Sequence, residues 1–254
     1  MFFLNLSMED IRLFHEKLLH LGPEWKVELV TVDEYRRRVD IHISYQLKEG
    51  PCPDTGELCK VHDYRDEREW RHLDSMGYAT FIHCRLPRVK NSFGKIRTIG
   101  ISWAEPGASH TAHFENRCID TLQSTHNRLR ASRLANTSDD MVCGIMYSSV
   151  ARGLERRDLD KNPVLALCID EKSIGKGQKY VSVLSDGQTG AAIEIAEGRD
   201  SASVEALIDR TFTVKQLGRI ERVCCDMWGP FMDTLKKNAR MQRWSMISSM
   251  WYAS

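Results

Sequence analysis

The chain has 254 residues and a formal net charge of +1. This length allows one large domain or two to three small ones, and the near-neutral charge gives no global signature of nucleic-acid binding, so any DNA affinity must come from local patches. No apolar run reaches membrane length, and residues 1–4 are too short for a signal peptide. The eight cysteines are scattered, several of them inside apolar runs, which indicates reduced thiols rather than a disulfide framework. We therefore expect a cytoplasmic protein with no membrane partner.

Residues 1–100 are predicted to form an α+β domain. Ser7 can cap a helix that carries Ile11, Phe14, Leu18 and Leu21 on one face and that ends at Gly22-Pro23. Strands are expected at residues 25–31 and 38–47. The second alternates strictly: apolar Val39, Ile41, Ile43 and Tyr45 on one side, polar Asp40, His42 and Ser44 on the other.

Residues 110–158 are predicted to form three short helices. Residues 113–122 place Phe114, Cys118 and Leu122 on one stripe, and residues 127–134 form a short basic helix. A third helix starts at residues 138–140, with Val142, Ile145, Met146, Ser149, Val150 and Leu154 expected to face inward. This pattern fits a helix-turn-helix segment, although an ordinary solvated three-helix bundle would read the same way. The candidate DNA contacts are basic side chains: Arg128, Arg130, Arg133, Arg152, Arg156 and Arg157.

Residues 162–237 carry the strongest pattern. An apolar run at 164–169 predicts a strand buried on both faces, and strands at 180–185 and 191–196 flank a turn at 186–190. A helix at 201–212 and a strand at 222–225 complete a right-handed βαβ crossover. The first and last strands should then be neighbours.

An aspartate follows each of these two neighbouring strands. Asp170 comes after the first and Asp226 after the last. Two carboxylates at one sheet edge suit Mg²⁺ or Mn²⁺, and the chemistry they serve is in-line displacement at phosphorus. The competing interpretation is that each is only a cap or turn residue.

Four blocks in this region resemble the catalytic core of insertion-sequence transposases of the ISL-three family, and further blocks upstream resemble that family's N-terminal half. The core blocks are residues 167–173, 180–186, 196–200 and 225–231; the upstream blocks are residues 25–43, 51–53, 70–74, 86–90 and 114–115. The resemblance implies a ribonuclease-H-like α/β core of the Asp-Asp-Glu type, with Asp170 and Asp226 as metal-binding catalytic residues. It also implies binding to the terminal repeats of a bacterial insertion sequence, near the nucleoid, and it would allow a homo-oligomer on DNA.

The chain departs from the family where a zinc ribbon is expected. The family pattern places two cysteines in the first knuckle, but Thr55 stands where the second belongs, and Asn91 begins a second knuckle that has no ligands. Structural zinc requires four Cys or His ligands, so we expect a degenerate ribbon held by strand pairing and no stoichiometric zinc. A substitute set is conceivable: Cys52, Cys59, His62 and Cys84.

The last residues, 238–254, also depart from the family. They hold no glutamate, and the sequence has none after Glu221, so the third catalytic acid is missing. We interpret this tail as a frameshifted segment and the chain as a C-terminally truncated transposase without cleavage activity. The alternatives are a non-catalytic DNA-binding or inhibitory module, a non-functional pseudogene product, and a ribonuclease-H-like nuclease with its own two-acid site.

Overall fold

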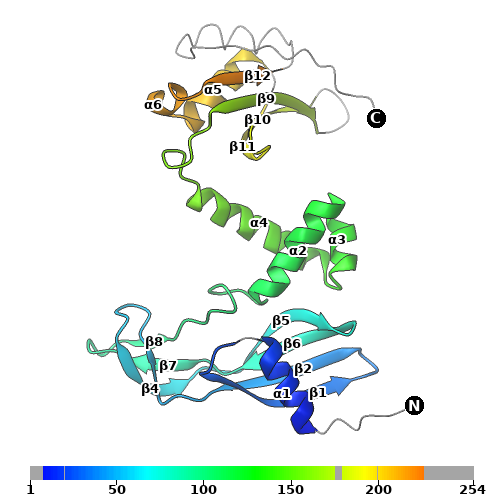
Figure 1. Ribbon diagram of the computed structural model, residues 1–254, viewed down its shortest axis with the longest axis vertical. Coiled ribbons are helices and arrows are strands. Elements are labelled where there is room, and N and C mark those ends of the chain that lie inside the picture. Colours follow the sequence, from blue (N-terminus) through cyan, green and yellow to red (C-terminus); the bar gives the residue numbers. More distant parts are fainter. Residues whose placement is uncertain (1–7, 20, 175–178, 199, 226–254) are drawn as a thin grey trace. The chain divides into compact units, whose positions relative to one another are not determined.

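The computed structural model describes residues 8–19, 21–174, 179–198 and 200–225. The chain divides into two compact units, Met1–Gly153 and Leu154–Ser254. Both mix helices and strands, so the fold is mixed α and β, as the sequence predicts (Figure 1). None of the described helices is long and apolar enough to cross a membrane.

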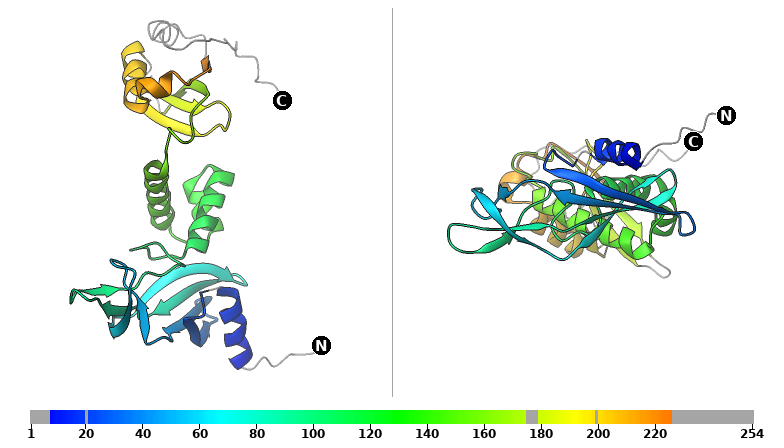
Figure 2. Two further views of the ribbon diagram at one scale, coloured as in Figure 1. Left: turned by 60° about the vertical axis from the view of Figure 1, so that its left-hand side comes forward. Right: turned by 90° about the horizontal axis from the view of Figure 1, so that it is seen from below.

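The first unit contains a four-stranded mixed sheet with a helix on one face. Strand order is β1-β2-β6-β5; the central pair β2–β6 is parallel, and the two outer pairs are antiparallel. The helix α1 lies against the sheet in both views (Figures 1 and 2). The elements are α1 (Met8–Leu19), β1 (Trp25–Asp33), β2 (Arg38–Tyr45), β5 (Arg68–Ser75) and β6 (Tyr78–Cys84).

The predicted alternation of β2 is confirmed. Its apolar side chains are buried and its polar ones only half-buried, so one sheet face joins the core while the other stays accessible. Three tryptophans anchor this core: the ring of Trp103 packs edge-on against Trp70 at 5.0 Å and against Trp25 at 6.2 Å.

The predicted inner face of the first helix is wrong in part. Phe14 and Leu18 are 51% and 58% exposed, whereas Leu19 and Leu21 are buried. The helix ends at Leu19 and the chain turns through Gly22, which has a φ of +97°. Leu21 therefore reaches the core from the connecting loop, while Phe14 and Leu18 stay half exposed beside the sheet.

A second, fully antiparallel sheet follows in the first unit, in the order β3-β4-β7-β8. It comprises β3 (Glu49–Pro51), β4 (Leu58–Tyr64), β7 (Pro87–Lys90) and β8 (Ile96–Thr98). Its tight turns precede β4 and β8. Gly56 and Gly94, at φ of +73° and +76°, adopt the left-handed conformation that these turns require.

The helices α2 (Ala112–Thr125), α3 (Arg128–Leu134) and α4 (Asp139–Arg156) follow. Side chains of Thr111 and Asn127 cap the first two, and Phe114, Cys118 and Val142 are buried between them, as predicted. The expectation that Val150 and Leu154 face inward is wrong, since both are more than half exposed. The buried residues of α4, Val142 and Ile145, both lie in the first half of the helix.

The second unit is built around a four-stranded sheet in the order β11-β10-β9-β12. Its elements are β9 (Ala166–Ser173), β10 (Tyr180–Asp186), β11 (Ala192–Glu197), α5 (Ser201–Thr211), α6 (Val214–Leu217) and β12 (Arg222–Cys225). The predicted order of hairpin, helix and closing parallel strand is confirmed. The short helix α6, which begins with a capping box between Thr213 and Gln216, was not predicted.

Candidate functional site

The parallel pair β9–β12 sets the geometry of the C-terminal sheet edge. Val223 stands opposite Leu167, and Cys225 opposite Ile169. Leu167, Ile169 and Val223 are buried in one cluster with the apolar stripe of α5. This apolar face fixes the register, because a shift of one residue would turn every side chain to the wrong side of the sheet.

The opposite face of the same two strands carries Cys168, Cys224 and Asp170. Cys168 and Cys224 stand opposite each other in register. Burial raises the pKa of the Cys168 thiol, and the neighbouring Cys224, Asp186 and Asp170 raise it further. The Cys168 thiol therefore stays protonated at neutral pH and acts as a small apolar group rather than as a metal ligand.

Asp170 is exposed on β9, and its Oδ1 accepts a hydrogen bond from the backbone N–H of Glu171 at 2.8 Å. The prediction that the strand ends before Asp170 is wrong, since β9 continues to Ser173 with Asp170 opposite Val183 of β10. Pairing with the antiparallel strand β10 extends β9 beyond the apolar run. Asp226, the second predicted metal ligand, lies outside the described residues.

The predicted DNA-contacting arginines of α3 are exposed. Arg130 and Arg133 are exposed at the surface, and Arg128 is partly exposed while its Nε donates to Asp139 at 2.7 Å. Asn127 caps this helix by accepting a hydrogen bond from the backbone N–H of Arg130 at 2.9 Å. The capped helix α3 therefore presents these arginine side chains to solvent.

The arginines at the end of α4 lie in different surroundings. Arg152 is paired with the buried carboxylate of Glu115, which also lies 3.2 Å from Nε2 of His110. Arg157 donates to the backbone carbonyl of Ile193. Arg156 is exposed. Engaging Arg152 with phosphate would leave a buried carboxylate with one partner fewer, so this residue acts first as part of the fold.

The two turns where a zinc ribbon was expected do face each other. Nδ2 of Asn91 lies 3.8 Å from Sγ of the buried Cys52. The hydroxyl of Thr55 also donates to this sulfur, and with Asn91 it holds the pKa of Cys52 below its ordinary value despite burial. The turns thus meet around a single sulfur, with hydrogen-bonding side chains at the positions where ligands were expected.

The substitute zinc set is not brought together in the same way. Burial raises the pKa of Cys84 to about 12 and also raises that of Cys59, while His62 is exposed on β4. Within the described residues, the group of His, Cys and acidic side chains that converges closely enough to share an ion is a different one: His42, Glu67 and His83. The sequence analysis missed it, although the alternation of β2 placed His42 on the polar face.

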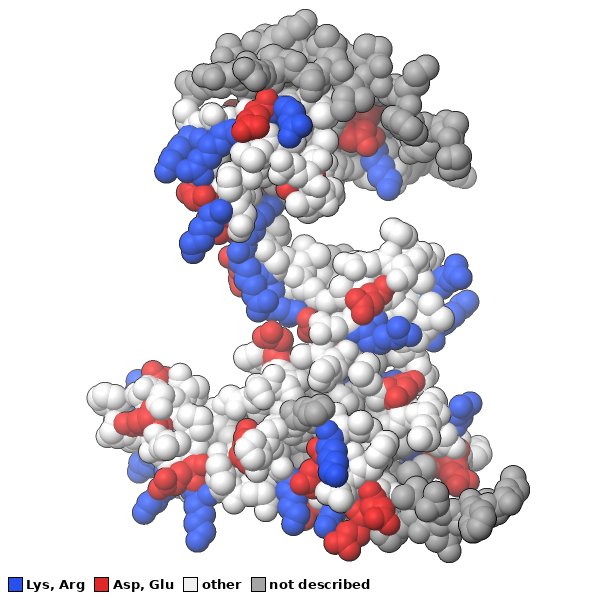
Figure 3. Space-filling view, in the orientation of Figure 1, with Lys and Arg blue, Asp and Glu red and all other residues white. Residues whose placement is uncertain are grey.

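Charge on the surface is mixed. In Figure 3, Lys and Arg are interspersed with Asp and Glu on the visible face, rather than gathered in one continuous basic patch. On this face, the basic residues form only small local sets, in keeping with the net charge of +1.

Comparison with known proteins finds similarity to transposases. Residues 167–241 match a family described as a transposase, of the DDE type and the ISL-three group. Two curated relatives, both named as the transposase for insertion sequence element IS1557, come from Mycobacterium tuberculosis strains CDC 1551 / Oshkosh and ATCC 25618 / H37Rv. Each is 25% identical over 142 residues, which cover 56% of this chain and 32% of the relative. The chain thus spans about a third of the length of these relatives. The segment 167–241, which contains most of the mixed sheet and the crossover helix, is therefore similar to transposases of the DDE type and the ISL-three group.

Proposed function

We propose that the chain is a transposase part of a bacterial insertion sequence that binds the DNA at the element's ends and carries two acids of a ribonuclease-H-like catalytic core. The observation that carries the proposal is the parallel register in which Cys225 stands opposite Ile169. Continuing that register by one residue would bring Asp226 opposite Asp170.

The residues of this edge fit a divalent cation. Asp170 is exposed and offers hard carboxylate oxygens, which Mg²⁺ and Mn²⁺ prefer. The hydrogen bond from the Glu171 N–H holds Oδ1 and orients the carboxylate. A bound ion would supply Lewis-acid stabilisation of charge on a phosphodiester. In this proposal the protein's task is to hold the two carboxylates one strand spacing apart.

The helical segment α2–α4 is proposed to bind DNA as a helix-turn-helix unit. The support is local: α3 carries Arg130 and Arg133, both exposed, on a helix capped at Asn127. These side chains are placed to contact phosphates, which position a protein on DNA without reading its sequence. Arg152 contributes by holding α4 against α2 through Glu115.

The 254-residue chain, assayed by itself, is proposed to bind DNA without cutting it. Its sequence offers no glutamate after Glu221, and the only acid after Asp226 is Asp233. Catalysis of phosphoryl transfer depends on charge stabilisation by precisely held groups, so the absence of one acid would abolish measurable cleavage. The same observation favours the second candidate, a non-catalytic module that occupies element ends.

DNA binding is tested by fluorescence anisotropy with DNA from the ends of the encoding element, over a salt series. The double variant Arg130→Ala/Arg133→Ala should weaken binding and reduce the slope of log K against log salt by about 2, because two phosphate contacts are lost. The matched control, Arg36→Ala/Arg85→Ala, removes the same charge from exposed positions of the first unit. Equal losses in both variants would leave only non-specific attraction and would overturn the assignment of α3.

The carboxylate edge is tested by Mn²⁺ binding, followed by electron paramagnetic resonance of the free ion. Asp170→Asn should weaken binding, whereas Asp209→Asn, which neutralises an exposed acid on α5, should not. Mn²⁺ affinity that is unchanged by Asp170→Asn would remove Asp170 from the site.

A further inference from the structure

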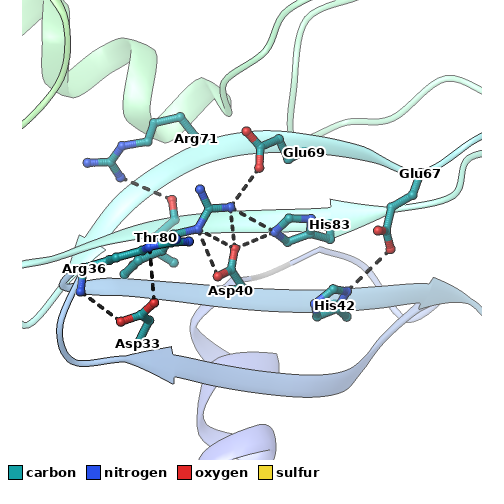
Figure 4. Close-up of polar contacts among 10 residues, drawn as sticks. Asp33, Arg36, Asp40, His42, Glu67, Glu69, Arg71, Thr80 and His83 are labelled. Carbon is teal, nitrogen blue, oxygen red and sulfur yellow. Dashed lines mark hydrogen bonds and ion pairs between the residues drawn. The ribbon is translucent and has the colours of Figure 1, made fainter.

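The accessible face of the first unit's mixed sheet brings two histidines and a glutamate together. His42 on β2 and His83 on β6 stand opposite each other in parallel register. Their rings stack with centroids 4.6 Å apart and planes at 19°. Glu67, in the segment before β5, places Oε1 3.5 Å from Nδ1 of His42 (Figure 4).

The parallel register explains why the two rings are adjacent. Paired residues on neighbouring parallel strands point to the same sheet face, about 4.8 Å apart in the hydrogen-bonding direction. Ile41 and Ile82, the residues before His42 and His83, are fully buried on the other face and hold both strands in this register. The histidine pair is therefore preorganised by the sheet core.

A second carboxylate fixes the orientation of one imidazole. Nε2 of His83 lies 2.6 Å from Oδ1 of Asp40, closer than its 3.5 Å distance to the guanidinium of Arg38. We assign the proton to Nε2 on this ground, so that Nδ1 carries the lone pair. A histidine that donates its other ring N–H to a carboxylate is the usual arrangement of a metal ligand.

The surrounding charges favour a cation. Arg38 is the nearest positive group, and it is held by two acids, Asp40 at 2.6 Å and Glu69 at 2.8 Å. Three acids, Asp40, Glu67 and Glu69, therefore face one arginine, so the formal charge around the two rings is negative.

From this geometry we propose that His42, His83 and Glu67 form a binding site for a zinc-like divalent ion, with water in the fourth position. The candidate ligand atoms lie within 4.8 Å of one another. Ligands around one tetrahedral zinc lie roughly 3.3 Å apart, given bonds of about 2.0–2.1 Å. Glu67 supplies the adjustment, since its side chain is 52% exposed and lies outside any strand.

Two imidazoles and a carboxylate are a ligand set that zinc accepts, and three protein ligands leave one position open. The bound ion would join β2, β6 and the segment before β5, which are far apart in the sequence. It would also lie well away in sequence from the degenerate knuckle turns at Cys52 and Asn91, and it uses no cysteine. The site is independent of the proposed carboxylate edge in the second unit.

The experiment is isothermal titration of the metal-free 254-residue protein with Zn²⁺ at pH 7.5. One site per chain is expected. Glu67→Gln and His42→Gln should each weaken binding by about 10-fold or more, and Asp40→Asn by about 10- to 100-fold through loss of orientation. Circular dichroism establishes that each variant is folded; Glu67 is exposed, so its substitution keeps the test informative if His42→Gln does not fold.

Matched controls separate this site from the others. His62→Gln removes an exposed histidine from the neighbouring sheet, Cys59→Ser a thiol, and Asp170→Asn an acid of the second unit; all three should keep the affinity. Co²⁺ bound in place of Zn²⁺ should show no thiolate charge-transfer absorption. Three outcomes would overturn the proposal. They are the absence of a stoichiometric site, a Zn²⁺ affinity that Glu67→Gln and His42→Gln leave unchanged, and loss of Zn²⁺ binding in Cys59→Ser or His62→Gln.

Discussion

Each of the two units contains a four-stranded mixed sheet with one parallel pair of strands. The two pairs differ in their position in the sheet and in the segment of chain that connects their strands. In the first unit the parallel pair β2–β6 is central, whereas in the second unit β9–β12 stands at the end of the described strand order. Both pairs place two side chains of the same type opposite each other: His42 with His83, and Cys168 with Cys224. A parallel register is thus used twice to juxtapose residues that are distant in sequence.

The difference between the pairs lies in what connects their strands. From β9 to β12 the chain passes through two further strands of the same sheet and then through helices. The sequence pattern predicts this connection. From β2 to β6 it passes through two strands of a separate sheet and then β5. No local pattern announces that return, so only the structure reveals which residues face each other across it.

The largest expected effect follows from the separateness of the two cores. Ile41 and Leu167 are fully buried, each in the hydrophobic cluster of its own unit. Ile41→Ala and Leu167→Ala should each lower the free energy of unfolding of the unit concerned by about 2–5 kcal/mol, through lost burial and the cavity left behind.

Hydrogen exchange followed by mass spectrometry can assign each loss to a unit. In Leu167→Ala, peptides from β9 and α5 should exchange faster while peptides from β2 and β6 keep their protection; Ile41→Ala should give the reverse. Faster exchange in both units with either variant would show that the two cores are coupled, and would break the comparison.

A smaller effect should distinguish the arginines of α4 from those of α3. Arg152→Ala leaves the buried carboxylate of Glu115 with one strong partner fewer, at a cost of about 1–3 kcal/mol. Arg130→Ala, on the exposed side of α3, should change the unfolding free energy by less than about 0.5 kcal/mol. Chemical denaturation measures both, and equal effects would contradict the structural role of Arg152.

The sequence predicted well where pattern and connection are local. The run at 164–169 and the stripe of Val204, Leu207 and Ile208 on α5 specified the crossover, because apolar periodicity reports directly which face is buried. It placed Asp170 on the correct strand but ended that strand too early. Residues 170–173 are polar, and among the described residues they are paired with β10, which keeps them extended.

The sequence predicted less well where tertiary context decides. The stripe of Phe14 and Leu18 has helical spacing, yet these side chains are about half exposed, because burial depends on tertiary packing that the spacing does not encode. Arg152 resembles any basic residue of a helix face until its contact with Glu115 is seen. The cluster of His42, Glu67 and His83 depends on the return of β6 to β2, which spacing alone does not encode.

A pH effect should appear in the first unit through His72. Burial, then the nearby His113, Arg71 and His15, lower the pKa of His72 to about 4, and its Nδ1 lies 2.9 Å from the Thr111 hydroxyl. The unfolded chain binds this proton near pH 6.5, but the folded chain does not until about pH 4, so stability is complete above pH 6.5 and falls as the pH drops towards 4.

Between pH 7 and pH 5 this histidine should cost about 1–2 kcal/mol of unfolding free energy. His72→Gln, which retains a hydrogen-bonding group beside Thr111, should flatten that part of the pH profile. His62→Gln serves as the control, because His62 is exposed on β4. Equal pH dependence in wild type and His72→Gln would show that other groups cause the acid sensitivity.

A gain of metal binding, rather than a loss of stability, is the main effect expected at the two turns around Cys52. Thr55 and Asn91 both donate hydrogen bonds to its sulfur, so cysteines at these positions would place three thiols around one point. Thiolates are strong zinc ligands, and water can complete a four-coordinate site. Thr55→Cys/Asn91→Cys should therefore bind Co²⁺ with thiolate charge-transfer absorption, although loss of the two backbone hydrogen bonds that Asn91 Oδ1 accepts lowers the metal-free stability. Thr55→Cys alone, with two thiols, should bind far more weakly.

The proposed histidine site of the same unit has no thiolate ligand, so metal bound there would not give the charge-transfer band. One spectrum therefore distinguishes metal bound at the two turns from metal bound at the sheet. Absence of the thiolate band in the double variant would mean that the turns, although they meet at Cys52, no longer hold a tetrahedral geometry.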